Sequence, residues 1–277
     1  MHCVVLADGY YSYPAQWFFP GADLVELARA LSERNLPFDS VLSPYTCLLI
    51  QTGRNVVLVD TGAGQTVRTA GALLARLEME GVRARDVDTV VLTHAHSDHI
   101  GGALDPQGAP AFPNARYVLA EAEFDFWMAA RVDLSALRVT QHYRAGLESV
   151  ANRSLTALRH KLELTCGETE VIPGIRLIPA PGHTPGHMAV MLTSGSERLL
   201  NIADAAQHPL HLERPDWENG MDLARAEAAA TRAMLLERAV SERIPVMAFH
   251  FPFPSLGTVR AKDAGWAWSP GLALGGV

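Results

Sequence analysis

The chain has 277 residues, a net charge of −7 and a hydrophobic content of 48%. This length allows one large domain with a substantial core, and an acidic balance without a basic run disfavours a nucleic-acid partner. No apolar stretch is long enough to span a membrane and residues 1–10 lack the basic flank of a signal peptide, so we expect a cytoplasmic protein with no membrane partner.

The N-terminal part of the chain begins with an aromatic-rich segment, residues 10–19. It has three alternative interpretations: a flap over a site, a contact in a homodimer, or ordinary packing against a sheet. Leucines spaced three and four apart then predict a helix over 23–35. Two short aliphatic runs, 47–51 and 55–60, are separated by Thr-Gly-Arg and predict a hairpin in a buried sheet.

The remaining elements alternate in type along the chain. The pattern predicts helical segments over 65–80, 120–164 and 222–242, and strands over 89–93, 175–180, 188–192, 199–202 and 245–249. Each half, about 1–165 and 166–277, thus offers strands followed by helices. We expect the two halves to share one core in a single domain, 1–277, with facing sheets and helices outside.

Three histidines and an aspartate lie within six positions directly after the predicted strand 89–93. They are His94, His96, Asp98 and His99. Imidazole and carboxylate groups suit zinc, iron, manganese or cobalt, each of which takes roughly four to six ligands. One ion cannot easily use all four side chains, so the cluster predicts a site for two ions with further donors from elsewhere.

Three further candidates each follow a predicted strand: His183, Asp204 and His250. Strand ends are where α/β sheets place their chemistry, so we expect these groups to meet the histidine cluster. The seven donors divide into His94, His96 and His183 on one ion and Asp98, His99 and His250 on the other, with Asp204 as the bridge.

The stretch THAHSDHIGG, followed in order by GHTPGH, an aspartate and a histidine, resembles the metallo-β-lactamase superfamily. The resemblance spans most of the chain. It implies an α/β fold, the four-layer αββα sandwich of two mixed sheets face to face, with the metals at one edge between the sheets. It also implies that Asp60 orients a metal-bound histidine, the alternative being a cap on the following loop.

Further segments look like methyl parathion hydrolase-like and acyl-homoserine lactonase-like metallo-hydrolases. They are the residues 112–115, Glu123 near Phe126 and Trp127, the residues 172–175, and the stretch from His250 to Arg260. The lactonases place a tyrosine three residues after the bridging aspartate, whereas this chain has Gln207 there.

The resemblance implies a hydrolase with two divalent ions per chain, for which we expect zinc, with iron, manganese or cobalt as alternatives. Paired ions roughly 3.5 Å apart lower the pKa of a shared water enough to leave a nucleophilic hydroxide. We expect Asp98 to orient that hydroxide as the catalytic residue. The expected partner is a small uncharged substrate, a lactone or an organophosphate triester, at an apolar mouth lined partly by Phe251 and Phe253.

Two other functions stay open. A thioesterase or glyoxalase II-like hydrolase would need a basic anchor near the mouth, for which Arg131 and Arg260 are the candidates. A non-hydrolytic iron-binding redox module belongs to a different class, and the presence of both His99 and His183 disfavours it.

Overall fold

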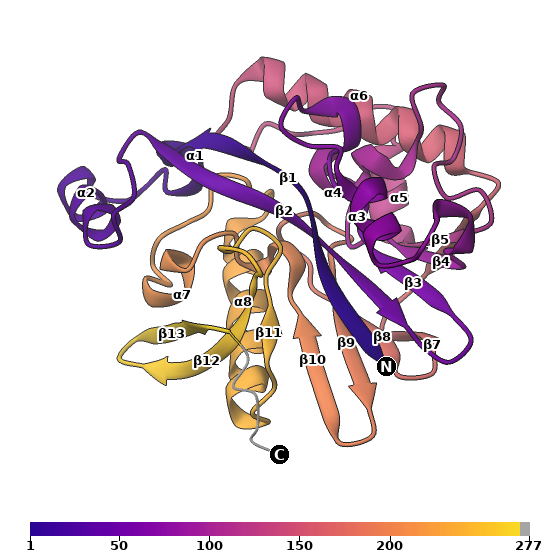
Figure 1. The fold of residues 1–277 in the computed structure, drawn as a ribbon. Helices are drawn as coiled ribbons and strands as arrows, with labels where there is room; N and C mark the ends of the chain where they lie inside the picture. Colours follow the sequence, from indigo (N-terminus) through magenta and orange to yellow (C-terminus); the bar gives the residue numbers. More distant parts are fainter. Residues whose placement is uncertain (272–277) are drawn as a thin grey trace.

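Two mixed β-sheets face each other, and helices cover the outer side of each (Figure 1). The computed structural model describes residues 1–271, so the last six residues of the predicted domain, 272–277, lie outside the described residues. The predicted αββα sandwich is confirmed.

The first sheet has the strand order β1-β2-β3-β4-β5-β6. Its strands are β1 (His2–Pro14), β2 (Ser40–Gln51), β3 (Val56–Val59), β4 (Thr89–Val91), β5 (Arg116–Ala120) and β6 (Leu162–Thr165). β1, β2 and β3 pair antiparallel, whereas β3 to β6 run parallel. The carboxyl ends of the parallel strands therefore lie at one common edge of the sheet.

The second sheet has the order β13-β12-β11-β10-β9-β8-β7. Its strands are β7 (Thr169–Ile172), β8 (Ile175–Pro179), β9 (Met188–Ser194), β10 (Glu197–Asn201), β11 (Val246–Met247), β12 (Leu256–Lys262) and β13 (Gly265–Pro270). Only β10 and β11 pair in parallel. Each sheet is thus built from one half of the sequence.

The α-helices are α1 (Ala15–Phe18), α2 (Leu24–Ser32), α3 (Leu73–Met79), α4 (Ser97–Ile100), α5 (Glu121–Trp127), α6 (Gln141–Leu158), α7 (Leu210–Glu213) and α8 (Arg225–Ser241). Short 3-10 turns lie at Gly64–Thr66, Ala84–Asp86, Gly101–Ala103 and Ala203–Ala205. In α2 the Asp23 carboxylate caps the helix by accepting from the backbone N–H groups of Val25 and Glu26, both at 3.0 Å. Among the described residues, no helix is both long and apolar enough to cross a membrane.

The core is divided into layers by the two sheets. Aliphatic side chains of both sheets fill the space between them, among them Val59 and Val118 from the first and Leu177 and Val190 from the second. Outside the second sheet, Leu235 and its neighbours on α8 form a separate buried cluster. Burial of each such side chain contributes about 1.5–3 kcal/mol, so the sandwich supplies a rigid frame for its edge.

Two of the predicted helical segments are wrong in extent. The segment 65–80 contains only the end of a 3-10 turn and α3, because Gly71 adopts a positive φ of 95° and breaks the helix. The segment 120–164 holds two helices separated by a loop, and its end forms β6. The hydroxyl of Thr140 accepts from the N–H of Tyr143 and so caps the N-terminus of α6.

The aromatic segment 10–19 forms the end of β1 and α1. Its inward members are buried: Phe18 and Phe19 pack against His211, and Tyr13 packs against Phe18. Tyr10 and Tyr11 stay 50% and 41% exposed. Ordinary packing therefore describes the inward members, and a homodimer contact stays a prediction.

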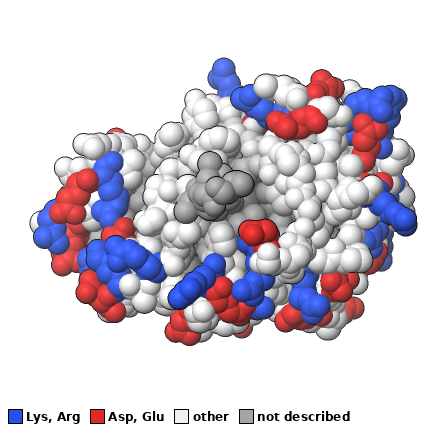
Figure 2. Space-filling view, turned by 60° about the horizontal axis from the view of Figure 1, so that its bottom comes forward, with Lys and Arg blue, Asp and Glu red and all other residues white. Residues whose placement is uncertain are grey.

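Charged side chains of both signs are interspersed around the rim of the face shown in Figure 2. A polyanion needs a continuous basic surface. Along the rim of the face drawn in Figure 2, the basic side chains of the described residues alternate with acidic ones.

Candidate metal centre

The seven predicted donors come from four loops at one edge of the sandwich. His94 and His96 follow β4, and Asp98 and His99 lie in α4, the next turn of the chain. The second sheet supplies the other three from the ends of its strands: His183 between β8 and β9, Asp204 after β10 and His250 after β11. The structure brings all seven together, and each is at most 5% exposed.

Their donor atoms form three overlapping groups. The atoms of each group all lie within 4.8 Å of one another. The groups are His94, His96 and His183; His94, His99 and Asp204; and Asp98, His99 and His250. The Asp204 carboxylate lies between the other two groups: Oδ1 is 3.3 Å from Nε2 of His99, and Oδ2 is 3.3 Å from Nε2 of His183. This is the arrangement of two adjacent cation positions with a shared carboxylate.

Several of these buried donor atoms have no hydrogen-bond partner within the described chain. They are the Nε2 atoms of His94, His96 and His99 and Oδ1 of Asp204. An unpaired buried polar atom costs about 1–3 kcal/mol, and four of them at one point call for a ligand. Imidazole nitrogen and carboxylate oxygen are the donors that zinc and similar ions take, so the residues fit the predicted metals.

Asp60 supports this centre from the end of β3. Its Oδ2 lies 2.8 Å from Nδ1 of His99, and its two oxygens accept from the backbone N–H and the hydroxyl of Thr93, both at 2.8 Å. The left-handed φ of 61° at Asp60 makes this reach possible at a cost in backbone strain. The contact leaves Nε2 of His99 directed into the centre, which is the role that the resemblance implies for Asp60.

Other supporting contacts carry no signal in the sequence. Oδ1 of Asp222 lies 2.8 Å from Nδ1 of His183, and the hydroxyl of Ser43 lies 2.7 Å from Nδ1 of His250. Both partners lie far along the chain from the histidines that they touch, and no motif marks either one. Each contact occupies one ring nitrogen and so fixes the orientation of the other.

His187 and His208 are both buried but differ in their surroundings. Nε2 of His187 accepts from the backbone N–H of Asp204 at 3.1 Å, so this ring fixes the backbone of the aspartate. His208 packs edge-on against Phe19 at 5.4 Å between ring centroids and caps the N–H of Leu210. These contacts describe His208 as a core residue.

Burial and charge set the protonation of the donors in opposite directions. Burial, together with the neighbouring histidines, holds the pKa of His94 and His96 well below the usual value. At His99 burial is outweighed by the carboxylates of Asp204 and Asp60, which raise its pKa well above the usual value. The nearby histidines likewise outweigh burial at Asp204 and lower its pKa, so this carboxylate stays ionised.

A cleft of about 600 Å³ adjoins this centre at Ser97, the residue between His96 and Asp98. Its lining residues come from β1, the loop before α3, α4 and α6: Tyr10, Tyr11, Ser12, Thr66, Val67, Arg68, Thr69, Ser97, His142, Tyr143, Gly146, Leu147 and Val150. Arg68 is the one arginine or lysine among them. A volume of this size is typical of a site for a small molecule.

The prediction that Phe251 and Phe253 line the mouth of the site is wrong. Phe251 is fully buried and packs edge-on against Trp268 at 4.9 Å, within the core outside the second sheet. Phe253 is 58% exposed and lines a separate pocket with Val4 and Val5. Of the three residues His250, Phe251 and Phe253 in the loop after β11, His250 is the one that reaches the donor cluster.

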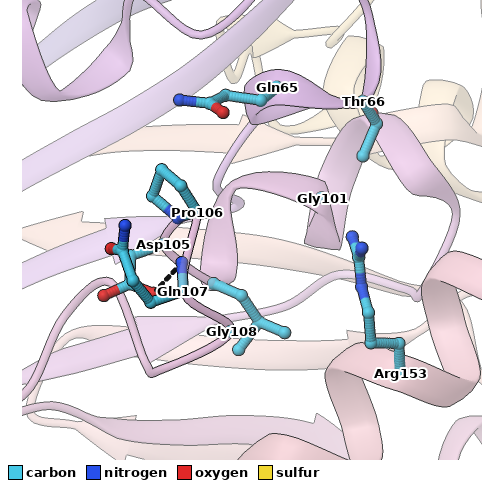
Figure 3. Close-up of a pocket in the computed structure, with 9 residues that line it drawn as sticks. Gln65, Thr66, Gly101, Asp105, Pro106, Gln107, Gly108 and Arg153 are labelled. Atoms are coloured by element: carbon cyan, nitrogen blue, oxygen red, sulfur yellow. Dashed lines mark hydrogen bonds between the residues drawn. The ribbon is translucent and has the colours of Figure 1, made fainter.

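A second, more polar pocket of about 430 Å³ adjoins the same motif (Figure 3). Gln65, Thr66, Gly101 and Arg153 face it from different segments, and the N–H of Gln107 donates to Asp105 at 2.9 Å on its rim. Thr66 lines both pockets, and none of the seven donors lines either one. The 600 Å³ cleft is the better candidate for a substrate because Ser97, which lies between the donors His96 and Asp98, is part of its lining.

The chain belongs to the metallo-beta-lactamase superfamily, whose family model matches residues 41–241. A protein of Mycobacterium bovis named "Probable metallo-hydrolase" is 30% identical over 185 residues, which are 58% of this chain and 56% of that protein. The chain thus matches little more than half the length of this relative. An N-acyl homoserine lactonase of a Bacillus species is 26% identical over 227 residues, covering 74% of this chain and 80% of the lactonase.

Solved structures agree with this family. The dizinc quorum-quenching lactonase AidC, in complex with a homoserine product, superposes with a TM-score of 0.91 and 28% identity over 98% of this chain and 95% of AidC. The hydrolase AbOPH superposes with a TM-score of 0.88 at 23% identity, over 97% of this chain and 93% of its own. The second likeness concerns the fold alone.

Proposed function

We propose that the chain is a dinuclear metal-dependent hydrolase that opens lactones. The observation that carries the proposal is the convergence of seven buried donors, four of whose atoms have no partner in the described chain. The likeness to a dizinc lactonase over nearly the whole chain supports the choice of substrate class.

In this proposal His94, His96 and His183 hold one ion, and Asp98, His99 and His250 hold the other, with Asp204 shared between them. We propose zinc for both positions. When bound, the ions polarise the substrate oxygen and supply an activated water at neutral pH. The Asp60 and Asp222 carboxylates keep His99 and His183 in the tautomer that leaves Nε2 free to act as a ligand.

Asp98 has a second role. Its Oδ2 lies 3.3 Å from Nε2 of His250, and Asp98 directly follows Ser97, which lines the cleft. From this position its carboxylate accepts a hydrogen bond from the attacking water and orients it toward the carbonyl carbon. Burial of all seven donors keeps bulk water away from the reacting groups.

The cleft favours an uncharged substrate with an apolar part. Tyr11, Tyr143, Leu147 and Val150 offer it rings and aliphatic surface, and Arg68 is its one fixed charge. An acyl-bearing lactone fits this lining. Organophosphate triesters, which are also uncharged, are the second substrate class.

The thioesterase or glyoxalase II-like alternative lacks its anchor. Arg131 and Arg260 are both exposed, and neither is among the residues that line the cleft. The cytoplasmic location, the homodimer and the organisation of 1–277 as one domain stay predictions from the sequence.

The test is a substrate panel on zinc-loaded protein. Lactones with acyl side chains, aryl phosphotriesters, thioesters and β-lactams are assayed side by side, and elemental analysis measures the zinc content. We expect about two zinc ions per chain and the highest kcat/KM on lactones. Activity that survives in a verified metal-free sample would refute the metal mechanism, and a preference for thioesters would refute the substrate class.

A further inference from the structure

We propose that Glu123 is a positioning residue that builds one of the two metal positions, that of His94, His96 and His183, and leaves the other unaffected. The proposal rests on the proposed metal centre. It concerns a carboxylate outside the set of seven donors.

The Glu123 carboxylate lies in α5 with an exposed fraction of 0%. It accepts four hydrogen bonds. Its Oε1 accepts from the backbone N–H of Ala95 at 2.9 Å and from the indole N–H of Trp127 at 2.7 Å. Its Oε2 accepts from the hydroxyl of Thr184 at 2.6 Å and from the backbone N–H of Gly186 at 3.0 Å. A buried carboxylate is stabilised by such a full set of donors.

Three of these four donors belong to the two loops that carry the three histidines, and the fourth, Trp127, lies on α5 itself. Ala95 stands between His94 and His96, and Thr184 directly follows His183. One oxygen of Glu123 therefore holds the first loop and the other oxygen holds the second. Nδ1 of His96 and Nε2 of His183 lie 2.9 Å apart across this junction.

Close packing leaves the two loops little freedom to shift independently. A Cβ atom at Gly186 would lie 2.2 Å from the backbone nitrogen of Glu123, so the second loop passes directly against α5. The Trp127 ring, held by the same carboxylate, packs edge-on against His96 at 5.7 Å. Without the carboxylate, four donors in this tight junction would lose their acceptor and the loops would move apart.

The other metal position is supported by different residues. Asp60 contacts His99 and Ser43 contacts His250, and the hydrogen bonds of Glu123 reach neither pair. A change at Glu123 should therefore act on one ion and not on both. A purely structural role would instead weaken the fold and both ions together.

The variant Glu123→Gln keeps the size of the side chain and removes its charge. Its amide NH2 must face either Ala95 and Trp127 or Thr184 and Gly186. The backbone and indole N–H groups can only donate, so at least one of the four hydrogen bonds is lost in either orientation. Glu121→Gln is the matched control, because Glu121 lies on the same helix and is exposed.

Stepwise titration of metal-free protein with zinc, followed by calorimetry, tests the proposal. We expect Glu123→Gln to weaken one of the two binding steps by about tenfold or more, the range known for residues that orient metal ligands, and to leave the other step unchanged. In a titration with cobalt, the absorption spectrum should have two components, one for each metal position. In Glu123→Gln only one of the two components should lose intensity. Glu121→Gln should match the unaltered chain in both titrations.

Equal weakening of both steps, or no change in either, would overturn the role of Glu123. Fewer than two binding steps in the unaltered chain would instead overturn the proposed function. If Glu123→Gln fails to fold, as judged by its circular dichroism, Thr184→Val replaces it and removes a single bond to Oε2. That variant should weaken the same step to a smaller degree, and equal loss in both steps would again overturn the proposal.

Discussion

The side-chain amide of Gln207 donates a hydrogen bond of 2.6 Å to Oδ2 of Asp204, the carboxylate that lies between the two proposed metal positions. The carbonyl of the same amide accepts from Asn219 at 2.8 Å, and Asn219 also donates to Asp222 at 3.3 Å. Asp222 in turn contacts His183. A continuous set of buried hydrogen bonds therefore joins the shared aspartate to one of the histidines.

We expect Gln207→Ala to reduce kcat/KM for lactones by about 10-fold to 100-fold with the zinc content unchanged, because Asp204 loses the donor that orients it but keeps its charge. Steady-state kinetics with elemental analysis checks this. Gln107→Ala is the control, since Gln107 lies on the rim of the separate polar pocket. Full activity of Gln207→Ala would show that the hydrogen bond from Gln207 does not orient Asp204.

His183→Ala should lower the metal content by about one ion per chain, because one position keeps only two histidines of its own. Elemental analysis after dialysis measures this directly. His160→Ala, a change at an exposed histidine, should retain both ions. Two ions in the His183 variant would remove this residue from the ligand set.

Asp98→Asn should fold normally and lose about 100-fold or more in kcat, because a neutral amide holds and orients the attacking water more weakly than a carboxylate does. Circular dichroism and lactone kinetics together check this. Asp125→Asn changes an exposed aspartate on α5 and should be neutral. Unchanged turnover in the Asp98 variant would exclude this carboxylate from the mechanism.

Gly146 provides a test of the cleft. It lies within α6 on the wall of the cleft, and a Cβ atom there would meet no other atom within 4 Å. Gly146→Ala should stabilise the fold by about 0.5–1 kcal/mol through helix propensity, measured by thermal unfolding.

Gly146→Phe should fill the cleft and raise KM most for lactones with long acyl chains, while the small Ala side chain leaves KM unchanged. Michaelis constants over a series of chain lengths give the comparison. If Gly146→Phe left KM equal for every chain length, the acyl group would have to bind elsewhere.

The sequence alone predicted the strand after which the histidines begin and the set of seven donors. It could do so because strands, the turns after them and a dense run of histidines are local features, and because strand ends in α/β sheets gather at one edge. The hairpin of β2 and β3 and the capped helix α2 were predictable for the same reason. The sandwich followed from the resemblance of the motifs.

Other features depend on contacts between residues far apart in the chain. Asp222 and Ser43 support His183 and His250 from segments that carry no motif, and the strand β1 is defined by its pairing with β2. The direction in which Phe251 points was decided by packing against Trp268. Hydrogen-bond partners and side-chain directions are set by the assembled sheets, which is why only the tertiary structure could decide them.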